Sequence, residues 1–233
     1  MPAAKAIMVI FSLLLAGCGT VPQNPTAPEL LRRSAAVSRA QNQPDEAKRL
    51  LQQAIVEQSE KTDDDCSSKA DLLRELASLH SSAGEIKEAE NYYRQALQIL
   101  QRTPRPSAAA IINLQTQLAG LGYRQARYQE AADLYHLVLT AEEQLLGIDH
   151  PDVLATLSIL GGLELKLRHY PIAEQLFQRQ LVGVQKLFGM EKREVVAVLE
   201  NLADVAENSG RTKEAAEWRA KAKQIRHKLC DEC

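Results

Sequence analysis

An alanine recurs every 42 residues along most of this 233-residue chain, and that period constrains the fold more than any other feature. The five alanines are Ala47, Ala89, Ala131, Ala173 and Ala215. Their neighbours repeat as well, with "IKEAENYYRQAL" at 86, "YQEAADLYHLVL" at 128 and "YPIAEQLFQRQL" at 170. Because the intervals are equal, the sequence predicts an array of one structural unit, each copy packing on the next.

Small and aromatic residues repeat at fixed distances from these alanines. A small residue stands twelve positions before each, at Ala35, Ala77, Ala119, Gly161 and Ala203. An aromatic residue follows four positions after the alanine in three copies, at Tyr93, Tyr135 and Phe177. Two helices come within about 8–10 Å only where side chains are short. The predicted fold class is all-α, each unit being a helix hairpin, with helices at about 152–168 and 171–188 in the best-formed copy.

This spacing of small and aromatic residues resembles the tetratricopeptide repeat. The 42-residue length, with "LGIDHPDV" joining two units, is similar to the kinesin-light-chain type of that repeat. The resemblance covers about residues 29–229 and implies a right-handed superhelical solenoid of about four to five hairpins. It also implies a concave groove, lined by the first helix of each hairpin, that binds a protein or peptide partner.

Polar side chains on the first helices are the candidate groove residues, because helical spacing sets them opposite the Leu/Ala core stripe. They are Arg74, Asn113, Gln117, Tyr123, Arg124, Lys166, Asn201 and Asp204. In the kinesin-light-chain type, an Asn in "LxNLA" hydrogen-bonds an extended peptide. The resemblance carries that role to Asn201 and, as a similar amide, to Gln117, whereas Glu75 and Ile159 depart from the pattern. Plain solvated surface is the alternative for each position.

The charges on these helices predict a polarity along the groove. Arg124 and Lys166 make its middle basic, whereas Glu200, Asp204 and Glu207 make its C-terminal end acidic. We therefore expect an extended partner to be oriented by its own charges.

The cluster Asp149, His150 and Asp152 suggests a metal or acid–base site, but the period argues against one. The segment "GIDHPDV" aligns with "GMEKREV" in the next unit, which lacks the first Asp and the His. The cluster is interpreted as a joint between units, with Asp149 able to cap the next helix and Pro151 in its first turn.

The N-terminal segment "MPAAKAIMVIFSLLLAGCGT" has the layout of a signal peptide, with one cation before an apolar run too short to span a bilayer. Its "LAGC" resembles the lipobox of bacterial lipoproteins, which implies cleavage after residue 17 and lipidation of Cys18. Gly19 resembles the sorting signal for the outer membrane. Residues 18–28 then form the lipidated Cys and a Pro-rich tether. An ordinary secreted protein with an incidental Cys18 is the alternative.

The C-terminal segment 230–233 carries Cys230 and Cys233 in a C-x-x-C pair, which we expect to form a local disulfide. Cys66 is then free or intermolecular. His227 together with the pair gives only three ligands, an incomplete metal site, and no metal is predicted.

Several function classes are excluded by what the sequence lacks. It has no nucleophile–base–orienter set and no Gly-rich phosphate loop, so we expect no enzymatic activity, no cofactor and no small-molecule substrate. The net charge of −2 argues against nucleic acid. The predicted function is a lipid-anchored scaffold in the periplasm that binds a partner in its groove. The alternative is a structural assembly factor of an envelope machine such as a pilus or secretion apparatus.

Overall fold

The computed structural model describes residues 26–59, 66–190 and 192–231, and all regular structure within these ranges is α-helical. The described helices are α1 Ala27–Ala40, α2 Pro44–Ser59, α3 Cys66–Ser82, α4 Ile86–Arg102, α5 Ala108–Arg124, α6 Tyr128–Leu146, α7 Pro151–Lys166, α8 Tyr170–Phe188, α9 Arg193–Asn208 and α10 Thr212–Asp231. The all-α prediction is confirmed, and α7 and α8 lie within two residues of their expected bounds.

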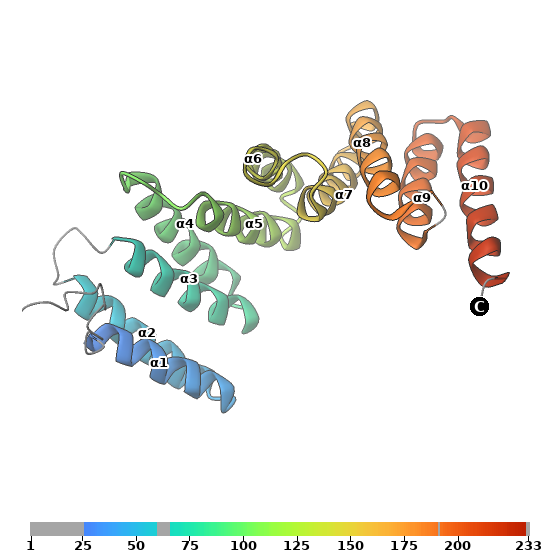
Figure 1. Cartoon of the computed structure of the whole chain (residues 1–233). Coiled ribbons are helices and arrows are strands. Elements are labelled where there is room, and N and C mark those ends of the chain that lie inside the picture. Colours follow the sequence, from blue (N-terminus) through green and yellow to red (C-terminus); the bar gives the residue numbers. More distant parts are fainter. Residues whose placement is uncertain (1–25, 60–65, 191, 232–233) are drawn as a thin grey trace, which may run out of the picture.

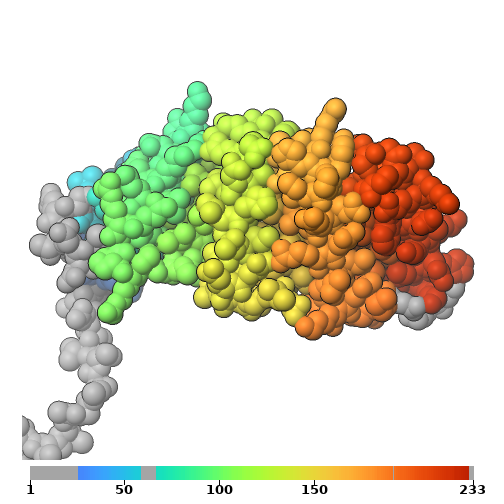
Figure 2. Space-filling model, turned by 90° about the horizontal axis from the view of Figure 1, so that it is seen from above, coloured from blue at the N-terminus to red at the C-terminus, as the bar shows by residue number. Residues whose placement is uncertain are grey.

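Consecutive helices pair as five antiparallel hairpins that stack in chain order (Figure 1). The odd-numbered helix of each hairpin is called helix A below and the even-numbered one helix B. In Figure 1 the hairpins of α1 to α4 run across the page and those of α8 to α10 run up it, so the array twists as it extends. Figure 2 shows the repeats in sequence order along one axis, as in a solenoid.

A residue with positive φ ends every helix A, and it too recurs every 42 positions: Asn42, Gly84, Ala126, Arg168 and Gly210. The N–H of the next residue donates to a carbonyl five positions back, as in Arg127 to Gly122 at 2.9 Å and His169 to Glu164 at 2.8 Å. This bond satisfies a carbonyl that the helix end leaves unpaired. The same left-handed turn therefore reverses the chain in all five hairpins.

The predicted core register is confirmed by burial. The five periodic alanines are at most 2% exposed, and the small residues of helix A are buried beside them. Tyr93, Tyr135 and Phe177 are buried as well. Phe177 packs so closely on helix A that a Cβ built on Gly161 would lie 2.7 Å from its ring. Short residues on helix A thus make the room that the aromatic residues of helix B fill.

The joint between the third and fourth hairpins is structural, as expected, but its cap differs from the prediction. His150, rather than Asp149, is the N-cap of α7, and its Nδ1 accepts from the Asp152 N–H at 3.2 Å. The Asp149 carboxylate instead bonds Lys186 Nζ at 2.5 Å, and Lys186 lies in the last turn of α8, just before the next joint. A long cation on α8 competes for Asp149 because the two joints lie side by side.

The two ends of the solenoid differ in polarity. Leu30 and Val37 are 49% and 55% exposed on α1, although Leu72 and Leu79, 42 positions later, are buried. At the other end, Arg219 stands where earlier repeats carry an aromatic residue, and it is exposed on α10. The last hairpin is therefore capped by charge, as a terminal repeat with a solvent-facing side requires.

Several sequence predictions fall outside the described residues. Segment 1–17, Cys18, most of 18–28 and Cys233 lie there, and the segment expected as a tail begins inside α10. Within the described ranges, none of the helices combines the length and apolar character that a membrane span requires.

Adjacent glycines of α7 offer a test of the packing register. Replacing Gly161 with Ala should lower the free energy of unfolding by about 1–3 kcal/mol, because the Phe177 ring must shift in a full core. The Gly162→Ala variant is the matched control, since its added Cβ meets no atom within 4 Å. That control should instead gain about 0.5–1 kcal/mol from helix propensity. Urea unfolding of both variants measures the difference, and equal effects would contradict this register.

Candidate functional site

The eight candidate groove residues lie on helices A of successive hairpins, namely α3, α5, α7 and α9. None is buried. Asn113, Gln117, Tyr123, Arg124, Lys166 and Asp204 are exposed, and Arg74 and Asn201 are half-buried. On α5 the exposed face carries Asn113, Gln117 and Arg124, opposite buried Leu114 and Leu118. Helix α5 thus presents a polar face to solvent, whereas α7 exposes Ile159 at the position of Gln117.

Two glycines lie in the middle of this surface. Gly120 of α5 and Gly162 of α7 occupy the same position in successive repeats, and a Cβ built on either would meet nothing within 4 Å. Nearby, Lys166 Nζ lies 5.8 Å from the Tyr123 ring centroid and 5.5 Å from that of Tyr128. The two rings pack edge to face with their centroids 5.5 Å apart. The result is an open floor beside a cation held over two aromatic faces.

The amides in the groove keep most of their hydrogen-bonding capacity. Gln117 Oε1 accepts from the Tyr93 hydroxyl at 3.4 Å, a long contact that leaves its NH₂ group for another acceptor. Asn113 is exposed in the second turn of α5. Arg124 makes one contact, from Nη1 to Ser81 Oγ at 3.2 Å. These side chains can donate to and accept from the backbone of an extended segment.

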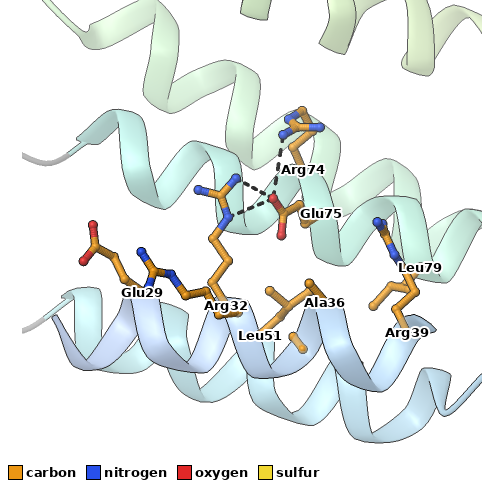
Figure 3. A pocket seen from close by; sticks show the side chains of 10 residues that line it. Glu29, Arg32, Ala36, Arg39, Leu51, Arg74, Glu75 and Leu79 are labelled. Atoms are coloured by element: carbon orange, nitrogen blue, oxygen red, sulfur yellow. Dashed lines mark hydrogen bonds and ion pairs between the residues drawn. The ribbon is translucent and has the colours of Figure 1, made fainter. Parts of the chain in front are cut away.

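A cavity of about 460 Å³ lies at the N-terminal end of the groove, between the first two repeats (Figure 3). Its lining is Glu29, Arg32, Arg33, Ala35, Ala36, Arg39, Leu51, Arg74, Glu75 and Leu79. In Figure 3 Arg32 reaches from α1 toward Glu75 on α3. Arg32 Nε and Nη2 lie 2.9 and 2.5 Å from Glu75 Oε1, and this hydrogen bond raises the pKa of Arg32. From this cavity the sequence prediction named Arg74 and Glu75 on α3, but none of the residues on α1.

The acidic C-terminal end predicted for the groove is largely neutralised. Arg219 of α10 bonds Asp204 Oδ1 at 3.2 Å and also bonds Glu207, and the latter contact lowers the pKa of Glu207. Arg226 lies 2.5 Å from Glu200 Oε1. Helix spacing on α9 alone could not reveal these partners, because they lie on the next helix. The predicted acidic side chains therefore lie at this end, but arginines of α10 offset much of their charge.

The histidines form structural contacts that spacing did not predict. Glu164, only 3% exposed, accepts from His136 Nε2 at 3.0 Å and from His169 Nδ1 at 2.8 Å. These three groups come from α6, α7 and the turn after α7. A buried carboxylate needs such partners, so they stabilise the stacking of the third and fourth hairpins. No set of three or more His, Cys, Asp or Glu residues in the described ranges could hold a metal ion.

Cys230 is exposed near the end of α10. Its expected partner Cys233, the lipidation site Cys18 and the side chain of Cys66 are not among the described residues. The local disulfide therefore stays a prediction.

The comparisons with known proteins agree with this geometry. One solved structure that shares the fold is described as kinesin light chain nearly identical TPR-like repeats, from Podosopora anserina. It matches with a TM-score of 0.71 and 22% identity, and the match covers 89% of this chain and 98% of that one. RapI in its apo form matches with a TM-score of 0.67, 16% identity and coverage of 88% and 72%. MamA matches with a TM-score of 0.64, 13% identity and coverage of 88% and 94%.

At these identities the solved structures establish the fold alone. No curated protein shows significant similarity to the chain. The family described as tetratricopeptide repeat matches residues 26–102 and 110–181, which together exceed half of the sequence. This match, together with the five stacked hairpins that repeat every 42 residues, shows that the chain belongs to the tetratricopeptide repeat family.

Proposed function

We propose that the protein is a lipid-anchored scaffold whose concave groove binds an extended segment of a partner protein. The observation that carries this proposal is the open strip along helices A, where Gly120 and Gly162 leave space and Asn113 and Gln117 keep hydrogen-bonding capacity. An extended backbone has unpaired N–H and C=O groups along its length, which amide side chains can satisfy at regular intervals.

Helices B are less suited to binding, because ion pairs between repeats already occupy much of their polar surface. Glu90 of α4 bonds Arg94 at 2.8 Å and Arg127, at the start of α6, at 2.5 Å. Glu174 of α8 bonds Arg211 at 2.7 Å in the same way. Side chains that bond each other must lose those contacts before they can bind a partner, whereas the middle of the groove has few to lose.

The anchor rests on the N-terminal sequence. The lipobox "LAGC" ends at Cys18, eight residues before Thr26 begins the described structure. A tether of that length reaches about 25 Å at roughly 3.1 Å per residue. It would hold the first hairpin close to the membrane, and Gly19 favours the outer membrane as that surface. The repeat domain would then face the periplasm.

A second candidate function, structural assembly within an envelope machine, is favoured by exposed apolar residues at two successive joints. They are Leu145, Leu146 and Ile148 at the end of α6 and Leu187, Phe188 and Met190 at the end of α8, each 39–63% exposed. The joint after α4, "TPRPS", carries no large apolar residue. Adjacent exposed apolar groups mark contact surfaces in soluble proteins. Copurification with a large membrane complex through these joints would support this function.

The anchor is tested by Cys18→Ser. Without its thiol the chain cannot be lipidated, so we expect the protein to leave the outer-membrane fraction and to lose incorporation of a radiolabelled fatty acid. Cell fractionation and the label measure the two effects, and Ser12→Ala in the apolar run is a control that should change neither. Unchanged partition of Cys18→Ser with the outer membrane would show that the lipoprotein assignment is wrong.

The groove is tested by charge reversal with Arg124→Glu plus Lys166→Glu. Because charges mainly set the rate and orientation of encounter, association with the native partner should slow about tenfold or more and lose part of its salt dependence. The matched control reverses two exposed cations of helices B, Lys87→Glu plus Lys213→Glu. Surface plasmon resonance with the partner captured by crosslinking gives the rates. An unchanged rate in the groove double variant, with circular dichroism unchanged, would place docking outside the groove, and equal slowing in both double variants would reduce the effect to net charge.

A further inference from the structure

The joints after α6 and α8 expose apolar side chains in matching positions. Each joint carries three, and the members of the two sets are 42 positions apart: Leu145 and Leu187, Leu146 and Phe188, Ile148 and Met190. Ile148 and Met190 are each 63% exposed. The glycines that end the two helices, Gly147 and Gly189, have φ values of 90° and 96°. Equivalent backbones therefore hold the two triplets at the same height above the ends of their helices.

The joints lie at one edge of the solenoid, called the joint edge below. Because each hairpin is antiparallel, every helix A begins at the edge where the preceding helix B ends, and the turns within hairpins lie at the opposite edge. In Figure 2 the joints lie along the lower side of the view and the turns along the upper side. The bond from Asp149 to Lys186 shows that the two apolar triplets are neighbours. Since α1 is a helix A, the chain also enters the first hairpin at the joint edge.

Cations lie beside the apolar triplets at this edge. Lys192 and Arg193 are exposed directly after the second triplet, and Arg102 and Arg105 are exposed at the joint after α4. Lys186 offsets the charge of Asp149. Phospholipid headgroups carry phosphates, and cations bordering exposed apolar side chains are the pattern of proteins that bind the surface of a bilayer.

We propose that the joint edge rests on the phospholipid bilayer that carries the anchor, with both triplets inserted at the boundary of headgroups and acyl chains. The inference rests on the proposed lipid anchor, whose tether is attached at this same edge. A planar surface contacts equal heights on successive repeats, which is how the two triplets are placed. The helices then stand on the bilayer, and the polar faces of helices A open to the side, where a partner can reach them.

Fluorescence quenching by brominated lipid measures this insertion. The processed, lipidated protein is purified in detergent and reconstituted into vesicles of phosphatidylethanolamine and phosphatidylglycerol. Trp218→Phe first removes the single tryptophan of the sequence. Ile148→Trp and Met190→Trp are the reporters. Bromine on the acyl chains should lower the emission of each about twofold or more, because an apolar group bound at the interface lies about 5–10 Å into this boundary.

Leu137→Trp is the matched control. Leu137 is 55% exposed on α6, about 13 Å before that helix ends at roughly 1.5 Å per residue, so its reporter should stay unquenched. A second pair of variants tests the cause. Met190→Asp, combined with the Ile148→Trp reporter, brings a charge to the edge and should remove about half or more of the quenching. Leu137→Asp with the same reporter should leave it unchanged, and circular dichroism checks the fold of every variant.

Flotation of the vesicles separates this proposal from the proposed function. Protein that floats while the reporters at 148 and 190 stay unquenched, or are quenched no more than the one at 137, would overturn the contact and leave the anchor in place. Protein that does not float would contradict the anchor and the contact together. Unquenched reporters in vesicles, with a discrete crosslink from position 190 to an envelope protein in cells, would assign the joints to that protein instead of lipid.

Discussion

The close contact between a short residue of helix A and a bulky residue of helix B determines this structure. The Gly161 and Phe177 pair shows it most clearly, since not even a methyl group fits between them. Repetition of that contact every 42 residues fixes how each hairpin closes and how the next one stacks on it. Because helices A are held at one side of the stack, their polar faces form a continuous surface. The groove is therefore a consequence of core packing, and its chemistry is free to vary from repeat to repeat.

Most of the fold could be predicted from the sequence because the periodic alanines and the small residues before them recur in five copies and the aromatic residues in three. The turns were less evident: Ala126 and Arg168 adopt the left-handed conformation that Gly84 and Gly210 adopt, and only their 42-residue register reveals this. The cap of α7 was assigned to Asp149, because the sequence alone did not reveal that Lys186 of α8 bonds the Asp149 carboxylate. The sequence pattern gives the position of a side chain on its own helix, but it does not give the side chain that it bonds on the next helix.

The candidate site shows the same limit. The eight predicted residues do lie on the exposed faces of helices A. The predicted site, however, began at Arg74, so Arg32, Arg33 and Arg39 of the first hairpin were missed. The acids of α9 were expected to make this end acidic, yet α10 supplies Arg219 and Arg226 to them. The resulting surface carries arginines at its N-terminal end, Arg124, Lys166 and exposed amides in the middle, and internally paired acids at its C-terminal end.

The central claim is that a partner docks on the faces of helices A, and site-specific photocrosslinking in the native envelope tests it most directly. A benzophenone side chain at Gln117 points from α5 into the groove, whereas the same group at exposed Gln175 points outward from α8. The account predicts a discrete crosslinked species, of defined mass and identifiable by mass spectrometry, from position 117 and none from position 175. A discrete product from position 175, with position 117 silent, would show that the partner binds helices B and would contradict the account.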